Sequence, residues 1–269
     1  MKLLKLSAVH ALATDVEFDV VIRGPIKHVM SLMKSLGYDG VEYNIPDPFK
    51  VNIGDLKRIT SSFGLEVAAI STGLSYLRYG YSLSSSKSDL RKKALEFFHK
   101  YIDMAVELDA RKVIIGLARG KCEGECKRAK EILRDSLEKL DAYAHERGVI
   151  LLLEPLNRYE TDLINRISEA LEFIKEFKSI RLLLDTFHAT LEERSVYEAI
   201  DFAGSYIAHV HVADSNRLAP GMGILDWERI IYRLIKVGYR GFLSVEARAE
   251  PDFEEMLKTA CNTLKPLLI

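Results

Sequence analysis

Glutamine is missing from this 269-residue sequence, and cysteine is scarce, with three residues in all. A small, odd number of cysteines argues against the paired disulfide framework of a secreted protein. Cys122 and Cys126 lack the second pair that a structural zinc site needs, so we expect ordinary thiols. The absence of glutamine beside abundant Glu, Lys and Arg is a bias of proteins from heat-loving organisms, and we expect a thermophile source.

An excess of charge of one sign is missing as well. The chain has 38 basic and 39 acidic residues and a net charge of -1, with a sequence pI near 6.7. Such a balance attracts neither a nucleic-acid backbone nor an anionic membrane surface. No apolar run approaches the roughly 18 residues of a membrane span, and Met1–Lys5 lacks the features of a signal peptide. We therefore expect a cytoplasmic protein with neither a membrane nor a nucleic acid as partner.

The sequence does contain a repeated pattern, in which a short apolar run is followed by a longer amphipathic stretch. This alternation predicts βαβ units around a parallel sheet. Eight runs qualify as strands: Leu4–Val9, Gly40–Tyr43, Glu66–Ser71, Lys112–Gly116, Val149–Leu153, Arg181–Leu184, Ile207–Val212 and Gly241–Val245. Since eight units occupy about 250 residues, we predict one (β/α)₈ TIM barrel of the α/β class over residues 1–269.

Between these runs the apolar residues follow the period of a helix, most clearly in Lys127–Arg147. Gly37, Gly148 and Gly238 each precede a predicted strand, where a left-handed cap would end a helix. No Pro-, Gly- or Ser-rich linker divides the chain, which favours a single domain. The long segment 72–88 after the third strand is expected to be a lid or pocket wall, or else a loop packed by its own tyrosines.

Four polar residues end or interrupt the last four predicted strands, roughly 30 residues apart, which is the length of one βα unit. They are Glu154, Asp185, His211 and Glu246. Because the carboxyl ends of barrel strands meet at one mouth, we expect the four side chains to converge there. Three carboxylates and an imidazole in such a site are costly unless a cation neutralises them.

This donor set suggests a divalent metal ion. Three oxygen donors and one nitrogen suit Mn²⁺ best, with Mg²⁺, Co²⁺ and Zn²⁺ as alternatives, and the absence of a thiolate argues against structural zinc. Any one of the four residues is explained equally well by a salt bridge near a strand end. Four in register are much harder to explain that way, so we expect one bound ion.

Five segments, from the first of these residues onward, resemble a known family in order and spacing. They are Glu154–Thr161, Leu184–His188, His209–Arg217, Pro220–Gly223 and Val245–Glu246. The chain resembles the sugar isomerase/epimerase superfamily with the xylose-isomerase-like barrel, and most closely its ketose 3-epimerases of the D-tagatose 3-epimerase and D-psicose 3-epimerase kind. The resemblance implies a small sugar as substrate and a homodimer or higher homo-oligomer.

The resemblance also implies roles for individual residues. Metal ligands would be Glu154, Asp185, His211 and Glu246, and sugar contacts would be Glu160, His188 and Arg217. The metal would act as Lewis acid for an ene-diolate. Glu154 and Glu246 would lie on opposite faces of the substrate, where one removes the proton beside the carbonyl and the other returns a proton, inverting C3. An ion pair between Glu160 and Arg217 is the alternative to their role in binding the sugar.

The N-terminal half departs from the family pattern. Ala8–Leu12 lacks the aromatic residues that ketose 3-epimerases place around the end of the sugar, and the segment after the fourth strand is basic. Three basic residues on loops of the expected catalytic face either contact a phosphate or carboxylate of the substrate or form solvated surface charge. They are Arg119, Lys121 and Arg248. We expect His209 to fill the barrel interior and Glu42 to support the site or the fold.

Several alternative functions stay open. Within the superfamily, an aldose–ketose isomerase of the hydroxypyruvate isomerase type, or a related dehydratase, would use similar ligands. An endonuclease IV-like DNA-repair enzyme shares the barrel but binds three zinc ions through many histidines, whereas this chain has seven histidines and none in the second or third predicted strand. A non-catalytic sugar-binding protein would not need both candidate acid/base glutamates.

Overall fold

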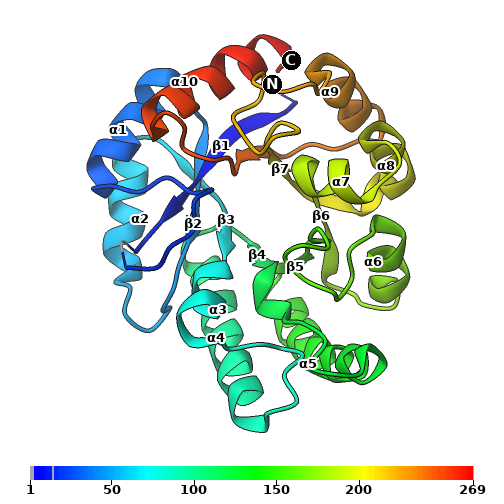
Figure 1. The fold of residues 1–269 in the computed structure, drawn as a ribbon. Coiled ribbons are helices and arrows are strands. Elements are labelled where there is room, and N and C mark those ends of the chain that lie inside the picture. Colours follow the sequence, from blue (N-terminus) through cyan, green and yellow to red (C-terminus); the bar gives the residue numbers. More distant parts are fainter. Residues whose placement is uncertain (1–2, 14, 269) are drawn as a thin grey trace.

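The strands of the protein close into a parallel eight-stranded barrel in the order β1 to β8 (Figure 1). The computed structural model describes residues 3–13 and 15–268, so Met1 and Lys2 of the N-terminal segment lie outside the described residues. The strands are β1 Lys5–Ala11, β2 Gly40–Asn44, β3 Glu66–Ser71, β4 Lys112–Ile115, β5 Ile150–Leu153, β6 Ile180–Asp185, β7 Ile207–Val212 and β8 Phe242–Val245. All eight predicted strands are present, and the predicted (β/α)₈ fold is confirmed.

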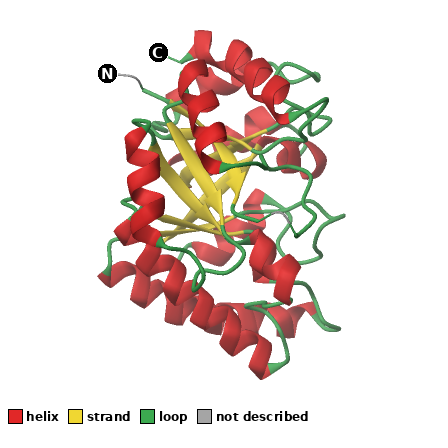
Figure 2. Ribbon diagram, turned by 90° about the vertical axis from the view of Figure 1, so that its left-hand side faces the viewer, coloured by secondary structure: helices red, strands yellow, loops and turns green. Residues whose placement is uncertain are grey.

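Helices form a ring outside the barrel (Figures 1 and 2). They are α1 Ile26–Leu36, α2 Ile53–Ser62, α3 Gly73–Tyr79, α4 Ser88–Glu107, α5 Cys126–Glu146, α6 Ile167–Ile174, α7 Thr186–Glu192, α8 Val196–Ala203, α9 Trp227–Lys236 and α10 Phe253–Leu264, with short 3₁₀ turns at Leu117–Arg119, Gly204–Tyr206 and Lys265–Leu267. The predicted glycine caps are confirmed, because Gly37, Gly148 and Gly238 have φ values of 83°, 62° and 87°. Among the described residues, no helix is long and apolar enough to cross a membrane.

The interior of the barrel has an apolar part and a polar part. Ala69, Ile114, Leu152 and Leu183, from the four consecutive strands β3 to β6, pack together as a small cluster. On β1, β2, β7 and β8 the fully buried residues include polar ones: Ser7, Glu42, His209 and Ser244. Burying polar groups costs free energy, and the hydroxyl groups of Ser7 and Ser244 have no hydrogen-bond partner among the described residues, so this part of the interior is not built for packing alone.

The segment 72–88 is partly helical and not a loop throughout. It contains the helix α3, and Tyr79 stacks on Tyr81 with ring centroids 5.1 Å apart. Both rings pack nearly perpendicular to the ring of Phe97 on α4. The expectation of a loop packed by its own aromatic residues is therefore correct about the packing and wrong about the absence of a helix.

The expectation of ordinary thiols at Cys122 and Cys126 is wrong, because the two form a disulfide at the start of α5. The intervening turn brings their Cα atoms to 4.7 Å, within the range that a disulfide spans. The number of cysteines argues against a framework of several disulfides, but it does not exclude one disulfide between cysteines that are close in the sequence. Cys261 stays a thiol and is buried.

Candidate active site

The four predicted ligands lie together at the carboxyl ends of four adjacent strands. Glu154 and Glu246 directly follow β5 and β8, Asp185 ends β6, and His211 lies near the end of β7. Asp185 is in register with His211, which is in register with Ser244 on β8. The parallel register therefore sets all four side chains at one level of the barrel.

The side chains converge on a single point. His211 Nδ1 lies 3.4 Å from Glu154 Oε1, 3.4 Å from Glu246 Oε2 and 3.9 Å from Asp185 Oδ2. One donor atom from each residue lies within 4.8 Å of all the others. Each of the four is at most 6% exposed, so the cluster is almost wholly shielded from water.

Gly116, the residue after β4, gives Glu154 the space that it occupies. A Cβ atom at Gly116 would lie 2.6 Å from Glu154 Oε2, which is closer than real atoms approach. Any other residue would push the carboxylate away from the cluster. This glycine is a part of the site that strand patterns alone do not reveal.

Burial and crowding of negative charge dominate the electrostatics of the cluster. Burial, followed by the charge of Glu154, raises the pKa of Asp185 to about 8. Burial also raises the pKa of Glu154. For His211, burial opposes the charged form, but the nearby charges of Glu42 and Glu246 outweigh it and raise its pKa well above the usual range. Three buried acids around one imidazole form an environment that favours a cation.

The residues fit a divalent metal ion. Glu154 Oε1 and His211 Nδ1 are buried and have no hydrogen-bond partner among the described residues, although both face the centre of the cluster. Three carboxylates and one imidazole nitrogen are a donor set for Mn²⁺ and similar ions. The structure therefore contains a candidate metal site, and the assignment of its ligands stays a prediction.

His188 presents a free nitrogen to the same cavity. It lies in the first turn of α7, whose N-cap is Asp185. The side-chain amide of Asn157 donates to His188 Nδ1 at 2.7 Å, which leaves the proton of the ring on Nε2. Nε2 is buried and has no partner among the described residues. Burial, with the charge of Arg217, lowers the pKa of His188 well below its usual range, so a neutral ring offers one N–H donor.

Glu160 and Arg217 form the ion pair that was the alternative to a binding role. Arg217 Nη1 donates to Glu160 Oε1 at 2.5 Å, and the guanidinium lies 4.9 Å from the centre of the Phe187 ring. Both charged side chains also line the cavity that contains Glu154, His188 and Glu246. Ion pairing therefore holds them at the cavity wall, and their contact with a sugar stays a prediction.

The N-terminal half contributes more of the cavity than the sequence suggested. Phe18, in the segment after β1, lines the cavity together with Asn44, Thr72 and Gly73. The first strand itself lacks aromatic residues, as predicted, but Phe18 supplies an aromatic ring from the following loop. Its position in a loop after the first strand was visible in the sequence, but no pattern there indicates that the loop turns this ring into the cavity.

Arg119, Lys121 and Arg248, the basic residues in segments that differ from the family pattern, are not among the residues that line this cavity. Arg119 is fully buried, and none of its guanidinium nitrogens has a hydrogen-bond partner among the described residues. Lys121 is exposed, and Arg248 is half exposed in an ion pair with Glu250. The expectation of surface charge is thus correct for Lys121 and Arg248 and wrong for Arg119, because backbone bonds to Leu83 and Ser84 hold its segment under a covering turn.

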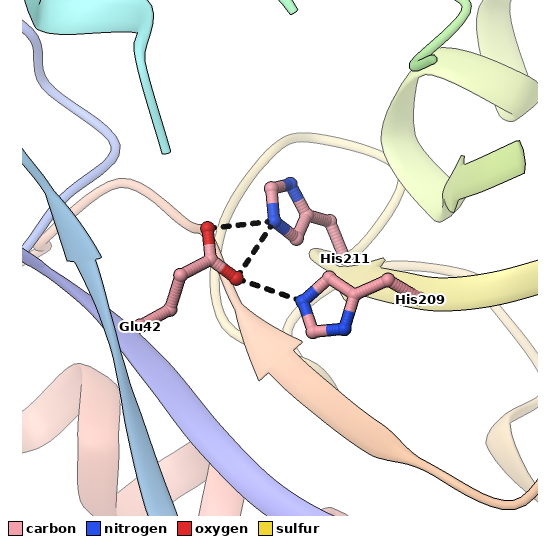
Figure 3. Close-up of side chains that lie close together, drawn as sticks. All are labelled: Glu42, His209 and His211. Carbon is pink, nitrogen blue, oxygen red and sulfur yellow. Dashed lines mark hydrogen bonds and ion pairs between the residues drawn. The ribbon is translucent and has the colours of Figure 1, made fainter. Parts of the chain in front are cut away.

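Glu42 and His209 lie in the polar part of the barrel interior, next to the cluster (Figure 3). Glu42 Oε2 lies 2.8 Å from His209 Nε2 and 3.1 Å from His211 Nε2. Burial opposes ionisation of Glu42, but the charge and hydrogen bonds of the two histidines hold its pKa well below the usual range. His209 therefore lies in the interior, as the sequence predicted. Glu42 contacts a residue of the cluster, and the sequence left it between a role in the site and a role in the fold.

Comparison with known proteins places the chain in a family. The family described as "Xylose isomerase-like TIM barrel" matches residues 30–267. The chain is 32% identical to an L-ribulose 3-epimerase of Mesorhizobium japonicum over 87% of this chain and 80% of the relative. It is 31% identical to a D-psicose 3-epimerase of Ruminiclostridium cellulolyticum over 82% and 77% of the two chains. A crystal structure of D-psicose 3-epimerase with D-tagatose from Clostridium cellulolyticum H10 superposes with a TM-score of 0.79, 25% identity and 98% coverage of both chains. The chain therefore belongs to the xylose isomerase-like TIM barrel family.

Proposed function

We propose that this protein is a metal-dependent ketose 3-epimerase. It is an enzyme of the sugar epimerase and isomerase class, like the curated relatives that it matches. The observation that carries the proposal is the convergence of Glu154, Asp185, His211 and Glu246 on one buried point. Two of these residues are glutamates from strands on either side of β6 and β7, so they approach a shared substrate from two directions.

The two glutamates act as acid and base. If one carboxylate oxygen of Glu154 or Glu246 binds the ion, the other oxygen of the same group can accept or return a proton of the substrate. One removes the proton from the carbon beside the carbonyl, and the other delivers a proton to the opposite face, so the configuration at that carbon inverts. When bound, a divalent ion supplies Lewis-acid polarisation of the carbonyl and the neighbouring hydroxyl.

The remaining cavity residues orient the sugar. The Nε2–H group of His188 donates to a substrate oxygen, because it is a buried donor with no protein partner among the described residues. The pair of Glu160 and Arg217 offers an acceptor and a donor to hydroxyl groups farther along the chain of the sugar. Among the described residues that line the cavity, Arg217 is the one Lys or Arg, and it is already paired with Glu160, which favours a free ketose over a phosphorylated one.

A substrate screen in D₂O tests the proposal. Ketopentoses, ketohexoses and their phosphates are incubated with the purified protein and Mn²⁺, Mg²⁺ or Co²⁺, with a chelated sample as control. We expect inversion at C3 with one deuterium incorporated there, loss of activity on chelation, and restoration by added metal. Movement of the carbonyl between C1 and C2 would instead identify an aldose–ketose isomerase, and loss of water a dehydratase. Full activity after complete removal of metal would refute metal dependence.

A further inference from the structure

The carboxylate of Glu42 forms a buried hydrogen-bond network beneath the candidate metal site. Glu42 extends from β2 toward β7, where His209 and His211 point back at it (Figure 3). Its Oε1 accepts from the hydroxyl of Ser71 on β3 and lies 3.0 Å from His211 Nε2. Its Oε2 lies 2.8 Å from His209 Nε2 and 3.1 Å from His211 Nε2. All of these groups are at most 4% exposed, so water does not compete for the bonds.

This network gives the two nitrogens of His211 different surroundings. Among the described residues, the hydrogen-bond partners of Nε2 are the acceptor oxygens of Glu42, so this nitrogen carries a proton. Nδ1 points the other way, toward Glu154, Glu246 and Asp185. A metal ligand needs a lone pair, and because Glu42 holds the proton on Nε2, Nδ1 is the nitrogen that would release its proton to a metal ion.

We propose that Glu42 is a positioning residue for the metal site, fixing the ring orientation and the Nε2–H tautomer of His211 so that Nδ1 faces the bound ion. This inference rests on the proposed function, because it concerns the ion which that function requires. Ser71 and His209 complete the hydrogen-bond network, because each donates to one oxygen of Glu42 and holds the carboxylate in place. Three donors from β3 and β7 thereby satisfy a carboxylate that has crossed the barrel from β2.

The location of Glu42 argues against a role as mere interior filling. The neighbouring part of the barrel interior is filled by Ala69, Ile114, Leu152 and Leu183, which shows that apolar residues pack there. Burying a carboxylate is costly unless it is fully hydrogen-bonded. A buried carboxylate with its hydrogen-bond partners lowers stability relative to apolar packing, so we expect one here because it serves the adjacent metal site.

Metal affinity, measured without any assay of activity, tests the proposal. Wild-type protein and the Glu42→Gln variant are stripped of metal and titrated with Mn²⁺, and free Mn²⁺ is followed by electron paramagnetic resonance. We expect affinity to fall about 10- to 100-fold, the usual effect of removing a carboxylate that orients a metal-binding histidine. Ser71→Ala, which removes one donor to Glu42, should weaken binding less, by about threefold to fivefold. This milder variant answers the question even if Glu42→Gln folds poorly.

Asp141→Asn is the matched control. Asp141 is also a buried carboxylate, and it accepts backbone N–H bonds from Lys178 and Ser179, which precede β6 at the far end of the barrel. Its loss should lower stability and leave metal affinity unchanged. A second readout is the proton NMR spectrum of the Co²⁺-loaded protein in water, where the Nε2–H of His211 should give one shifted, slowly exchanging signal. In Glu42→Gln this signal should move and exchange faster.

The outcomes are distinguishable. A wild-type protein that binds no divalent ion would overturn the metal site and the proposed function together with this inference. Equal affinity in wild type and a folded Glu42→Gln variant, with an unchanged N–H signal, would overturn the role of Glu42 alone. Loss of a second equivalent of metal in the variant would also overturn it, because Glu42, His209 and His211 would then be ligands of another ion.

Discussion

Removal of the metal ion should make the stability of the protein fall as pH rises through neutrality. In the folded, metal-free protein, burial and the charge of Glu154 raise the pKa of Asp185 from 3.8 to about 8. Between these values the folded state holds a proton that the unfolded state has released, so stability decreases with increasing pH. His211 acts in the same direction, because its raised pKa contributes stability below its unfolded value of about 6.5 that is lost as pH rises further.

The magnitude follows from the shift. Each pKa unit corresponds to about 1.4 kcal/mol, so Asp185 alone costs up to about 3 kcal/mol of the free energy of unfolding between pH 6 and pH 8. Most acids with lowered pKa values, such as Glu42 and Glu192, are ionised in both states over this range and add no slope. The buried histidines His10, His188 and His209 have lowered pKa values, so they add an opposing slope, which fades above about pH 7 as the histidines of the unfolded chain lose their protons. The part of the slope that disappears when Asp185 cannot ionise is therefore specific to the candidate metal site.

Guanidinium chloride unfolding of chelated protein at pH 6, 7 and 8 measures this slope. Asp185→Asn is the informative variant, because asparagine can still accept the helix-capping bond from His188 N while it cannot ionise. We expect the variant to lose most of the slope. With saturating Mn²⁺ the wild type should instead gain stability with pH, since metal ligands bind best when deprotonated. A metal-free protein whose stability is flat or rises between pH 6 and 8, or an equal slope in Asp185→Asn, would refute this reasoning.

Three further predictions concern residues around the site. Arg119→Met removes a buried positive charge whose field reaches Glu154, so Mn²⁺ affinity should rise several-fold by calorimetric titration; weaker binding would contradict the placement of that charge. His188→Leu removes one donor to the substrate, and kcat/KM should fall about fivefold to tenfold while Mn²⁺ affinity stays constant; a loss of metal binding instead would make His188 part of the metal site. Cys126→Ser opens the disulfide to Cys122 and should lower the free energy of unfolding by about 2 kcal/mol, with kcat unchanged; an unchanged unfolding curve under oxidising conditions would show that the bridge does not stabilise the fold.

The barrel and the convergence of the four residues of the candidate metal site were predictable because both depend on local, periodic signals. Parallel strands buried on both faces give nearly continuous apolar runs, and the ends of those runs locate the carboxyl ends of the strands. One polar residue at each end was therefore enough to place Glu154, Asp185, His211 and Glu246 at a common mouth. The parallel register then fixes the relative height of these residues along the barrel, since Asp185 and His211 are directly paired.

The unpredicted features depend on contacts between distant parts of the chain. Glu42 and His211 are 169 residues apart, and no pattern in either strand indicates their bond. Arg119 lies in a basic segment typical of an exposed loop, and it is buried because the turn before α4 covers it. Phe18 reaches the cavity from a loop whose course the sequence does not specify.

The most direct test of the two-glutamate mechanism is hydrogen exchange in the Glu154→Gln and Glu246→Gln variants. Each variant is incubated in D₂O with Mn²⁺ and with either epimer of the accepted ketose, and deuterium at C3 is measured by NMR. Both variants should bind Mn²⁺ and lose at least about 10²-fold of the epimerisation rate. Each should still exchange the C3 proton of one epimer only, and the two variants should prefer opposite epimers. Exchange of both epimers by the same variant, or near-normal epimerisation by either, would contradict acid/base catalysis by Glu154 and Glu246 from opposite faces.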